Sequence, residues 1–429
     1  MKIATLYTYF KECGRVTTDT RNCPEGSMFI ALKGETFNGN AFAKQALEKG
    51  CRYAVVDEAQ YADDPNIFLV DDCLKTLQML AREHRRRMGT PIVGITGTNG
   101  KTTTKELIAT VLQKRYNVLY TQGNLNNHIG VPLTLLGLTE EHEMAVVEMG
   151  ANHPGEIRTL VNIAEPDCGL ITNVGKAHLE GFGSFEGVVK TKSELYDYLR
   201  SKENAFIFLD KDNHVLCDAS AGLKSIGYGL EGDDLYIKGK LHACAPFLDF
   251  EWEHEGKAYD VNTHLIGAYN VKNALAAIAI GCRFEVPAEA ICEALNGYIP
   301  SNNRSQLTET KDNHLIVDAY NANPTSMMAA LENFRLMEVA HKVAILGDMK
   351  ELGEGSVDEH RKIVSFLEGC GFERIILVGD EFGKANSGFE WYKNTDDLKA
   401  KISEEKISGK FVLIKGSNSM KLAPLKDIL

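Results

Sequence analysis

Lys101 and Thr102 are the residues whose types and positions most directly indicate chemistry. They end the stretch TGTNGKT, in which Gly97 and Gly100 allow the backbone to turn tightly. A lysine ammonium at this place can reach the outer phosphates of a nucleotide, and the threonine hydroxyl can face Mg²⁺. The strict P-loop pattern requires glycine where this chain has Ile95, so a shorter GTNGKT form is present. We therefore predict a nucleotide-phosphate site, with a purely structural turn as the alternative.

The residues on either side of this turn predict the elements that would position it. Ile92, Val93 and Ile95 precede the turn and predict a buried parallel strand. Residues 101–116 follow it and predict a helix, because apolar residues recur at helical spacing from 107 to 112. A strand, a glycine-rich turn and a helix N-terminus together point backbone N–H groups at a phosphate, where the helix dipole also favours negative charge.

A second group of polar residues follows the ends of two other apolar runs. Glu148 ends the run 144–149, Asn173 ends the run 168–174, and His178 comes shortly after. If both runs are strands beside the phosphate-loop strand, these side chains lie near Lys101 and Thr102. A carboxylate and a neutral imidazole are suitable ligands for a divalent cation next to ATP phosphates. The alternative is that Glu148 caps a turn and His178 is a surface histidine.

The whole chain predicts an α/β protein of three domains, at residues 1–89, 90–297 and 298–429. Its 429 residues are enough for about two or three hydrophobic cores. The first domain is expected to be a small α/β module, and the second a P-loop ATPase domain with a parallel sheet. The third is expected to be a Rossmann-like, doubly wound domain.

Short apolar runs bounded by turn signals supply the expected strands. They are residues 28–32 and 53–57 in the first domain, 92–95, 144–149, 168–174 and 205–210 in the second, and 315–320, 342–348, 374–380 and 410–416 in the third. Helical patterns lie between them, among them residues 74–89, 269–282, 287–295, 325–338 and 356–370. From Ser225 to Leu265 short strand-like runs predict an antiparallel addition to the central sheet.

Composition and charge exclude several classes of function. The net charge of −12 argues against non-specific binding to nucleic acid or to an anionic membrane. The ten cysteines are scattered, with no CxxC pair and no zinc-type spacing, which favours reduced thiols. No stretch has the apolar core of a signal peptide or the length of a membrane span. We expect a cytoplasmic protein, a monomer, with no nucleic-acid partner and no membrane insertion.

Ten stretches, taken in order, resemble the Mur ligase family over nearly the whole chain. They are TDTR (18–21), TGTNGKTTT (96–104), GNLNNHIGVPLTLL (123–136), VVEMGANHPGEI (146–157), ITNVGKAHLEGFGS (171–184), KSE (192–194), YNVKNALAA (269–277), DAYNANPTSM (318–327), LGDMKELG (346–353) and KGS (415–417). Within the family the match is best with the type that adds a dipeptide. A type that adds a single amino acid is the first alternative, and a P-loop ATPase or nucleotide-binding regulator without ligase activity is the second.

The resemblance implies an ATP- and Mg²⁺-dependent, ADP-forming ligase of peptidoglycan synthesis. The terminal carboxylate of UDP-N-acetylmuramoyl-tripeptide would attack the γ-phosphate of ATP to give an acyl phosphate. The amine of D-alanyl-D-alanine would then attack the acyl phosphate, and phosphate would leave. The first domain would bind the UDP-sugar, the central one ATP and Mg²⁺, and the last the incoming dipeptide.

The resemblance also implies a role for individual residues. The nucleotide would be bound by Gly97, Thr98, Asn99, Gly100, Lys101, Thr102, Thr103, Asn270, Asn273, Arg304 and Asp318. Mg²⁺ would be bound by Thr102, Glu148 and His178, and the carboxylate of a carbamylated Lys192 would support a second metal ion. The catalytic group would be Lys101, Glu148, His178 and Lys192. The substrates would be bound by Thr20, Arg21, Asn126, Asn127, Asn321, Asn323 and Ser326.

Two of these roles have local structural alternatives. Lys192 must lose its proton before it can be carbamylated, and its alternative is a helix-surface lysine paired with Glu194 or Asp197. Asn323 precedes a predicted helix, so it could serve only as the cap of that helix.

The chain also departs from the family pattern in places. It has Asn38 and Asn40 where the family usually has Asp-Gly-His, and Asn418 where it often has arginine.

Overall fold

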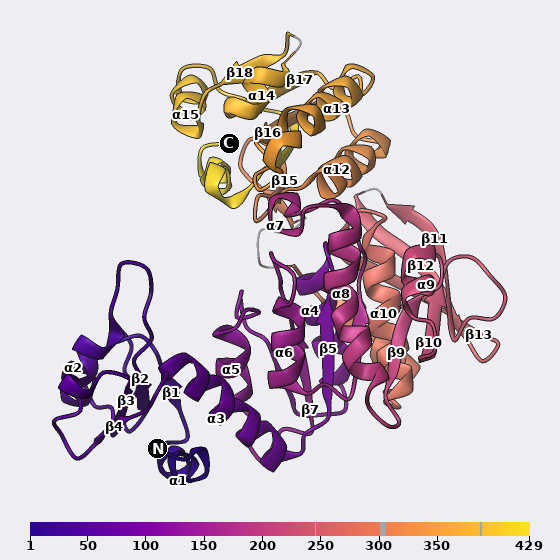
Figure 1. Ribbon diagram of the computed structural model, residues 1–429. Coiled ribbons are helices and arrows are strands. Elements are labelled where there is room, and N and C mark those ends of the chain that lie inside the picture. The colour runs from indigo at the N-terminus through magenta and orange to yellow at the C-terminus, as the bar shows by residue number, and fades with distance from the viewer. Residues whose placement is uncertain (245, 301–305, 387) are drawn as a thin grey trace.

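The computed structural model describes residues 1–244, 246–300, 306–386 and 388–429. These residues form three α/β units in chain order, each built around its own sheet (Figure 1). The N-terminal unit lies beside the central unit, and the C-terminal unit lies at the end of the central unit near α7. No helix of the described residues is long and apolar enough to cross a membrane. The predicted fold class, three α/β units in sequence, is confirmed.

The N-terminal unit contains a parallel sheet in the order β1–β2–β3–β4. Its strands are β1 (Val16–Thr17), β2 (Met28–Ile30), β3 (Tyr53–Val56) and β4 (Ile67–Leu69), with helices α1 (Ile3–Cys13) and α2 (Ala43–Glu48). Helix α1 buries Leu6, Tyr7 and Phe10 on one face and ends at Gly14 with φ 64°. The two strands that the apolar runs predicted are present, and α1, β1 and β4 were not predicted.

Helix α3 (Cys73–Met88) joins the first unit to the second. It begins where the Asp72 side chain accepts a hydrogen bond from Lys75 N–H, and it ends at Gly89 with φ 68°. It packs against α1 on one side and against α5 (Gly130–Leu135) and α6 (Glu156–Ala164) on the other. Both units therefore share one hydrophobic core.

The central sheet has the order β13–β12–β11–β10–β9–β8–β5–β7–β6. Its strands are β5 (Ile92–Thr96), β6 (Val118–Tyr120), β7 (Met144–Glu148), β8 (Cys168–Ile171), β9 (Phe206–Asp210), β10 (Lys224–Gly229), β11 (Ile237–Cys244), β12 (Phe247–His254) and β13 (Lys257–Ile266). Pairing is parallel from β6 to β11 and antiparallel in β11–β12 and β12–β13. The predicted antiparallel addition is therefore present.

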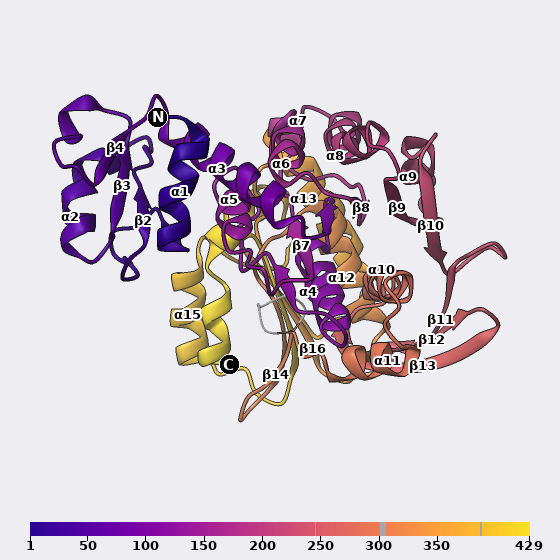
Figure 2. The ribbon, with the colours of Figure 1, turned by 90° about the horizontal axis from the view of Figure 1, so that it is seen from below.

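Helices cover both faces of the central sheet (Figure 2). Helices α4 (Lys101–Leu112), α10 (Asn270–Arg283) and α11 (Ala288–Gly297) pack on one face. The other face is covered by α5, α6 and α8 (Phe185–Arg200), and the short helices α7 (Leu179–Phe182) and α9 (His214–Ala219) follow β8 and β9. The buried strand β5 thus ends between two helical layers, where the phosphate loop begins.

The C-terminal sheet has the order β14–β15–β19–β16–β17–β18, parallel except for β14. Its elements are β14 (Gln306–Glu309), β15 (His314–Asp318), α12 (Pro324–Leu336), β16 (Lys342–Gly347), α13 (Ser356–Glu368), β17 (Arg374–Val378), α14 (Asp380–Ala385), β18 (Glu390–Tyr392), α15 (Thr395–Glu404) and β19 (Phe411–Lys415). Alternate strand residues enter two cores, one under α12, α13 and α14 and one under α15. This is the doubly wound pattern that the sequence predicts.

Candidate active site

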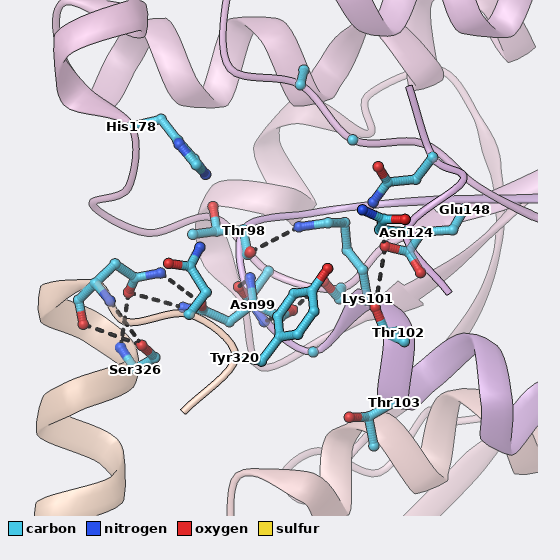
Figure 3. Close-up of a pocket in the computed structure, with 18 of the residues that line it drawn as sticks. Thr98, Asn99, Lys101, Thr102, Thr103, Asn124, Glu148, His178, Tyr320 and Ser326 are labelled. Atoms are coloured by element: carbon cyan, nitrogen blue, oxygen red, sulfur yellow. Dashed lines mark hydrogen bonds between the residues drawn. The ribbon is translucent and has the colours of Figure 1, made fainter. Parts of the chain in front are cut away.

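A cavity of about 960 Å³ lies at the carboxyl ends of the central strands. Residues from all three units line it, including Gln78 of α3, the phosphate loop, Asn273 of α10 and Ser326 of α12. Figure 3 shows Thr102 facing Glu148 and the Lys101 ammonium directed at Thr98, with Tyr320 and Ser326 entering from the C-terminal unit. Ligands of doubly wound proteins bind at this edge of the sheet.

The phosphate loop connects β5 to α4 through Gly97 and Gly100, where any other residue would be strained. Gly97 has φ 146°, and a Cβ atom there would lie 2.0 Å from Thr172 Oγ1. Gly100 has φ 75°, and its Cβ would lie 2.8 Å from Asn273 Oδ1. Left-handed backbone and close neighbours therefore both require glycine. The loop ends at the N-terminus of α4, whose first residue is Lys101.

The segment after β8 holds the loop in place. Asn173 accepts a hydrogen bond from Asn99 N–H and donates one to Asn99 O, each 2.9 Å long. Thr172 Oγ1 donates to the same carbonyl at 2.7 Å. Lys101 Nζ donates to Gly97 O at 2.8 Å and to Thr98 O at 2.9 Å. Thr98, Asn99 and Thr103 line the cavity, so the loop forms its floor.

Both strands predicted to flank the phosphate-loop strand do so. Glu148 of β7 lies opposite Ile95 of β5, and Ile171 of β8 lies opposite Thr96. Glu148 is almost fully buried, and its Oε1 accepts hydrogen bonds from Thr102 Oγ1 (3.2 Å) and Asn126 Nδ2 (2.8 Å). Within the described residues its Oε2 has no hydrogen bond. Glu148 therefore faces the phosphate loop and does not cap a turn.

Lys192 is a buried residue of α8, only 2% exposed. Its Nζ donates to Ala151 O at 3.2 Å. Burial, and secondly the positive charge of Lys101, hold the pKa of Lys192 well below its ordinary value. The alternative of a surface lysine is wrong, because Glu194 accepts two backbone hydrogen bonds at the start of α6 and Asp197 pairs with Arg200.

His178 precedes α7 in left-handed backbone, with φ 50°. Its side chain is 23% exposed, and its Nδ1 pairs with the carboxylate of Glu351 in the C-terminal unit. In Figure 3 its ring points toward the phosphate loop. His178 is thus part of the cavity wall rather than a surface histidine.

The residues expected around the rest of the nucleotide are partly engaged in the fold. Asn273 accepts from Thr104 Oγ1 at 3.0 Å and donates to Asn270 Oδ1 at 2.8 Å. Both asparagines line the cavity. Asp318, at the end of β15, accepts a hydrogen bond of 2.5 Å from Lys415 Nζ. Arg304 lies outside the described residues.

The expected substrate residues separate into two groups. Asn126, Asn127, Asn321, Asn323 and Ser326 line the cavity. Asn323 and Ser326 form a capping box at the start of α12, as the capping alternative predicts, and the Asn323 amide also reaches Asn99.

Thr20 and Arg21 do not line the cavity. The Arg21 side chain is 89% exposed and pairs with Asp19 in the N-terminal unit.

Two of the positions that depart from the family pattern, Asn38 and Asn40, are structural in this chain. Asn40 is fully buried, and it donates to Asp57 Oδ1 and accepts from Asp57 N–H. Asn38 accepts from the Asn40 amide and donates to Glu58. The two asparagines therefore fix the loop that follows β2.

Sequence reasoning left several lining residues without a role. Lys272 pairs with Asp210 (2.9 Å) and with Asp212 at the wall of the cavity, and Lys415 pairs with Asp318. Asp210 and Lys415 each end a predicted strand, and this position was the signal in the sequence that could have placed them at the cavity. Lys105 is not among the lining residues, but it is buried on α4 with its Nζ 4.0 Å from Glu148 Oε2. Its place on the buried side of that helix was the available signal.

Comparison with known domain families places three stretches of the chain in Mur ligase domains. Residues 13–85 match the catalytic domain of the Mur ligase family, residues 95–281 its middle domain and residues 303–418 the glutamate ligase domain of Mur ligases.

Relatives with assigned activities match over nearly the full length. The chain is 36% identical to the UDP-N-acetylmuramoyl-tripeptide–D-alanyl-D-alanine ligase of Bacillus subtilis (strain 168), over 96% of this chain and 93% of that protein. It is 34% identical to the ligase of the same name from Escherichia coli (strain K12), over 94% and 91% of the two chains. The chain belongs to the Mur ligase family.

Solved structures of related proteins superpose on this chain over nearly its full length. MurF from Acinetobacter baumannii superposes with a TM-score of 0.88 at 29% identity, covering 99% of this chain and 98% of that one. MurF ligase from Thermotoga maritima in complex with ADP gives 0.86 at 28% identity, covering 96% of each chain.

Proposed function

We propose that this chain is an ATP-dependent, ADP-forming ligase that joins D-alanyl-D-alanine to UDP-N-acetylmuramoyl-tripeptide, giving the pentapeptide precursor of peptidoglycan. The observation that carries the proposal is a phosphate loop at a cavity lined by all three units, in a chain matching ligases of that name over more than nine-tenths of its length. The ADP complex of the Thermotoga relative supports ATP as the phosphate donor.

The phosphate loop suits a triphosphate. The backbone N–H groups of Gly100, Lys101 and Thr102 lie at the N-terminus of α4, where the helix dipole favours an anion. The N–H groups of Thr98 and Asn99 donate to Asn173 and fix the loop. The Lys101 ammonium now lies on the carbonyls of Gly97 and Thr98, and we propose that it turns to the outer phosphates when ATP binds. Asn270, Asn273, Arg304 and Asp318 are proposed to contact the rest of the nucleotide.

The residues at the phosphate loop also fit Mg²⁺. Glu148 Oε2 is buried without a hydrogen bond in the described residues, near the Thr102 hydroxyl and 4.0 Å from the Lys105 ammonium. A buried carboxylate oxygen with this unused capacity suits a hard cation. We propose that Thr102, Glu148 and His178 hold it and that a carbamylated Lys192 supports a second metal ion. When bound, Mg²⁺ would neutralise charge on the phosphates and on the reacting carboxylate.

Lys192 has the surroundings that carbamylation requires. Its burial and its lowered pKa favour the neutral amine, which is the form that adds to CO₂. The positive charge of Lys101, which disfavours an ammonium at Lys192, would instead attract the anionic carbamate.

The chemistry then follows from the geometry. The tripeptide carboxylate attacks the γ-phosphate held by Lys101, and ADP leaves. The amine of D-alanyl-D-alanine attacks the acyl phosphate, loses its proton and expels phosphate to form the amide bond. The walls of the cavity limit the access of water, which would otherwise hydrolyse the acyl phosphate.

We assign residues 1–89, with Thr20 and Arg21, to the UDP-sugar, residues 90–297 to ATP, and residues 298–429 to the dipeptide. Asn126 and Asn127 are proposed for the tripeptide, and Asn321, Asn323 and Ser326 for the dipeptide. We further propose a monomer, because one chain lines the cavity from all three units. Ten free thiols and the use of ATP favour the cytoplasm.

Phosphate release with each substrate omitted in turn tests the proposal. Release should require UDP-N-acetylmuramoyl-tripeptide, ATP and D-alanyl-D-alanine together. Phosphate release when a single amino acid replaces D-alanyl-D-alanine would indicate a different Mur ligase. Release without any muramoyl peptide would indicate an ATPase and contradict the proposal.

A further inference from the structure

Glu351 and His178 meet across the boundary between the central and C-terminal units. His178 follows β8, and Glu351 lies in the loop after β16. Both residues have left-handed backbone, with φ 50° and φ 64°, which is uncommon for residues other than glycine. Their side chains pair, and Glu180 N–H points at Glu351 O at 3.5 Å. Strained backbone on both sides of one contact is a feature of functional sites.

The pairing selects one nitrogen of the histidine. Nδ1 lies against Oε2 of Glu351 as an ion pair, without the alignment of a hydrogen bond within the described residues. Because a carboxylate oxygen can only accept a proton, this contact favours a proton on Nδ1. The Nε2 atom of a neutral imidazole then carries the free lone pair. Histidine ligands of metal ions commonly donate their other ring N–H to a carboxylate, which sets both the tautomer and the orientation of the ring.

The loop that carries Glu351 is firmly anchored in the C-terminal unit. Asp348 is fully buried and accepts hydrogen bonds from the N–H groups of Glu381 and Phe382. Met349 N–H donates to His360 Nε2, and Lys350 N–H donates to Ser417 Oγ. Glu351 therefore moves with its unit as a rigid part.

We propose that Glu351 is a positioning residue that presents His178 to the metal site only when the C-terminal unit is seated on the central one. The inference rests on the proposed function, because it takes His178 as a ligand. It adds that one ligand of the central unit is oriented from another domain. Metal-assisted phosphoryl transfer is thereby coupled to the arrival of the unit that is proposed to bring the dipeptide.

A second ion pair at the same boundary provides a matched control. Lys176, two residues before His178, has its Nζ 3.3 Å from Oε1 of Glu359, which is a residue of α13 in the C-terminal unit. Glu359→Ala removes a bond between the units without touching His178. It therefore separates loss of domain attachment from loss of histidine orientation.

The test measures Mn²⁺ binding to the full chain in the presence of ADP. The electron paramagnetic resonance signal of free Mn²⁺ reports how much of the ion is unbound. Glu351→Ala should weaken Mn²⁺ binding by about tenfold or more. Binding of ADP without metal and the melting temperature should stay unchanged. Glu351→Asp should recover part of the Mn²⁺ affinity, and Glu359→Ala should bind Mn²⁺ like the wild type.

Two results would overturn the inference. One is unchanged Mn²⁺ affinity in Glu351→Ala, and the other is an equal loss in Glu359→Ala, which would reduce Glu351 to a domain contact. The assay contains neither muramoyl peptide nor dipeptide. If Glu351→Ala weakens Mn²⁺ binding but the wild-type protein forms no amide, the proposed ligase function is contradicted and the role of Glu351 stands.

Discussion

Asn99 of the phosphate loop and Asn323 at the start of α12 exchange side-chain hydrogen bonds across the boundary between two units. Asn323 Nδ2 donates to Asn99 Oδ1 at 2.7 Å, and Asn99 Nδ2 lies 3.4 Å from Asn323 Oδ1. The same Asn323 caps α12. One side chain therefore starts a helix of the C-terminal unit and reaches the loop proposed to bind ATP.

The two roles of Asn323 can be separated by substitution. Asn323→Ser keeps a good N-cap but loses the amide that reaches Asn99, so the KM for ATP should rise several-fold with little change in melting temperature. Asn323→Ala loses the cap as well and should cost about 1 kcal/mol of stability in addition. Equal kinetics for Asn323→Ser and the wild type would show that the contact with Asn99 has no part in catalysis.

Lys101→Ala should reduce turnover by more than about a hundredfold, because the positive charge nearest the transferred phosphate is lost. Its circular dichroism spectrum and melting temperature should match those of the wild type. Lys114→Ala, which removes a lysine of the same region paired with Glu293 at the surface, is the control and should keep full activity. Full activity in Lys101→Ala would exclude the phosphate role.

Carbamylation of Lys192 predicts dependence on CO₂. Protein equilibrated with ¹³C-bicarbonate should show a carbamate resonance that is absent from Lys192→Arg. Activity should fall in CO₂-depleted buffer and return when bicarbonate is added. A resonance that persists in Lys192→Arg would belong to another amine and contradict the assignment.

Buried His84 predicts loss of stability in acid. Its Nε2 lies 2.9 Å from Leu138 O, so Nε2 carries the proton and Nδ1 accepts from the Tyr7 hydroxyl at 3.0 Å. Burial lowers the pKa of His84 below its ordinary 6.5, so the unfolded chain takes up this proton at a higher pH than the folded one. Stability should therefore fall as the pH drops below about 6.5.

Urea unfolding at pH 8 and pH 5 tests this. His84→Gln should be less stable at pH 8, because it loses two hydrogen bonds, but should lose less stability between the two pH values than the wild type. The change in the free energy of unfolding with pH can decrease by at most about 1.4 kcal/mol per pH unit in the variant, which is the value for one proton. An identical pH dependence in both proteins would assign the acid sensitivity to other groups, such as buried His360, whose pKa burial also lowers.

The elements around the phosphate loop were predictable because their signals are local. The apolar run before Gly97 and the helical spacing after Lys101 predicted β5 and α4, and strand-end positions predicted that Glu148 and Asn173 lie beside them. The contact between His178 and Glu351 was not predictable, because it depends on how two units pack and no periodic pattern encodes it. The burial of Lys192 likewise comes from the packing of α8.

The mass of the product formed from UDP-N-acetylmuramoyl-tripeptide, D-alanyl-D-alanine and ATP tests the proposed function most directly. The account predicts that the muramoyl peptide gains the mass of the whole dipeptide less one water. It also predicts that one ADP and one phosphate appear for each molecule of product. A product extended by a single residue, or ADP formed while the muramoyl peptide keeps its mass, would contradict it.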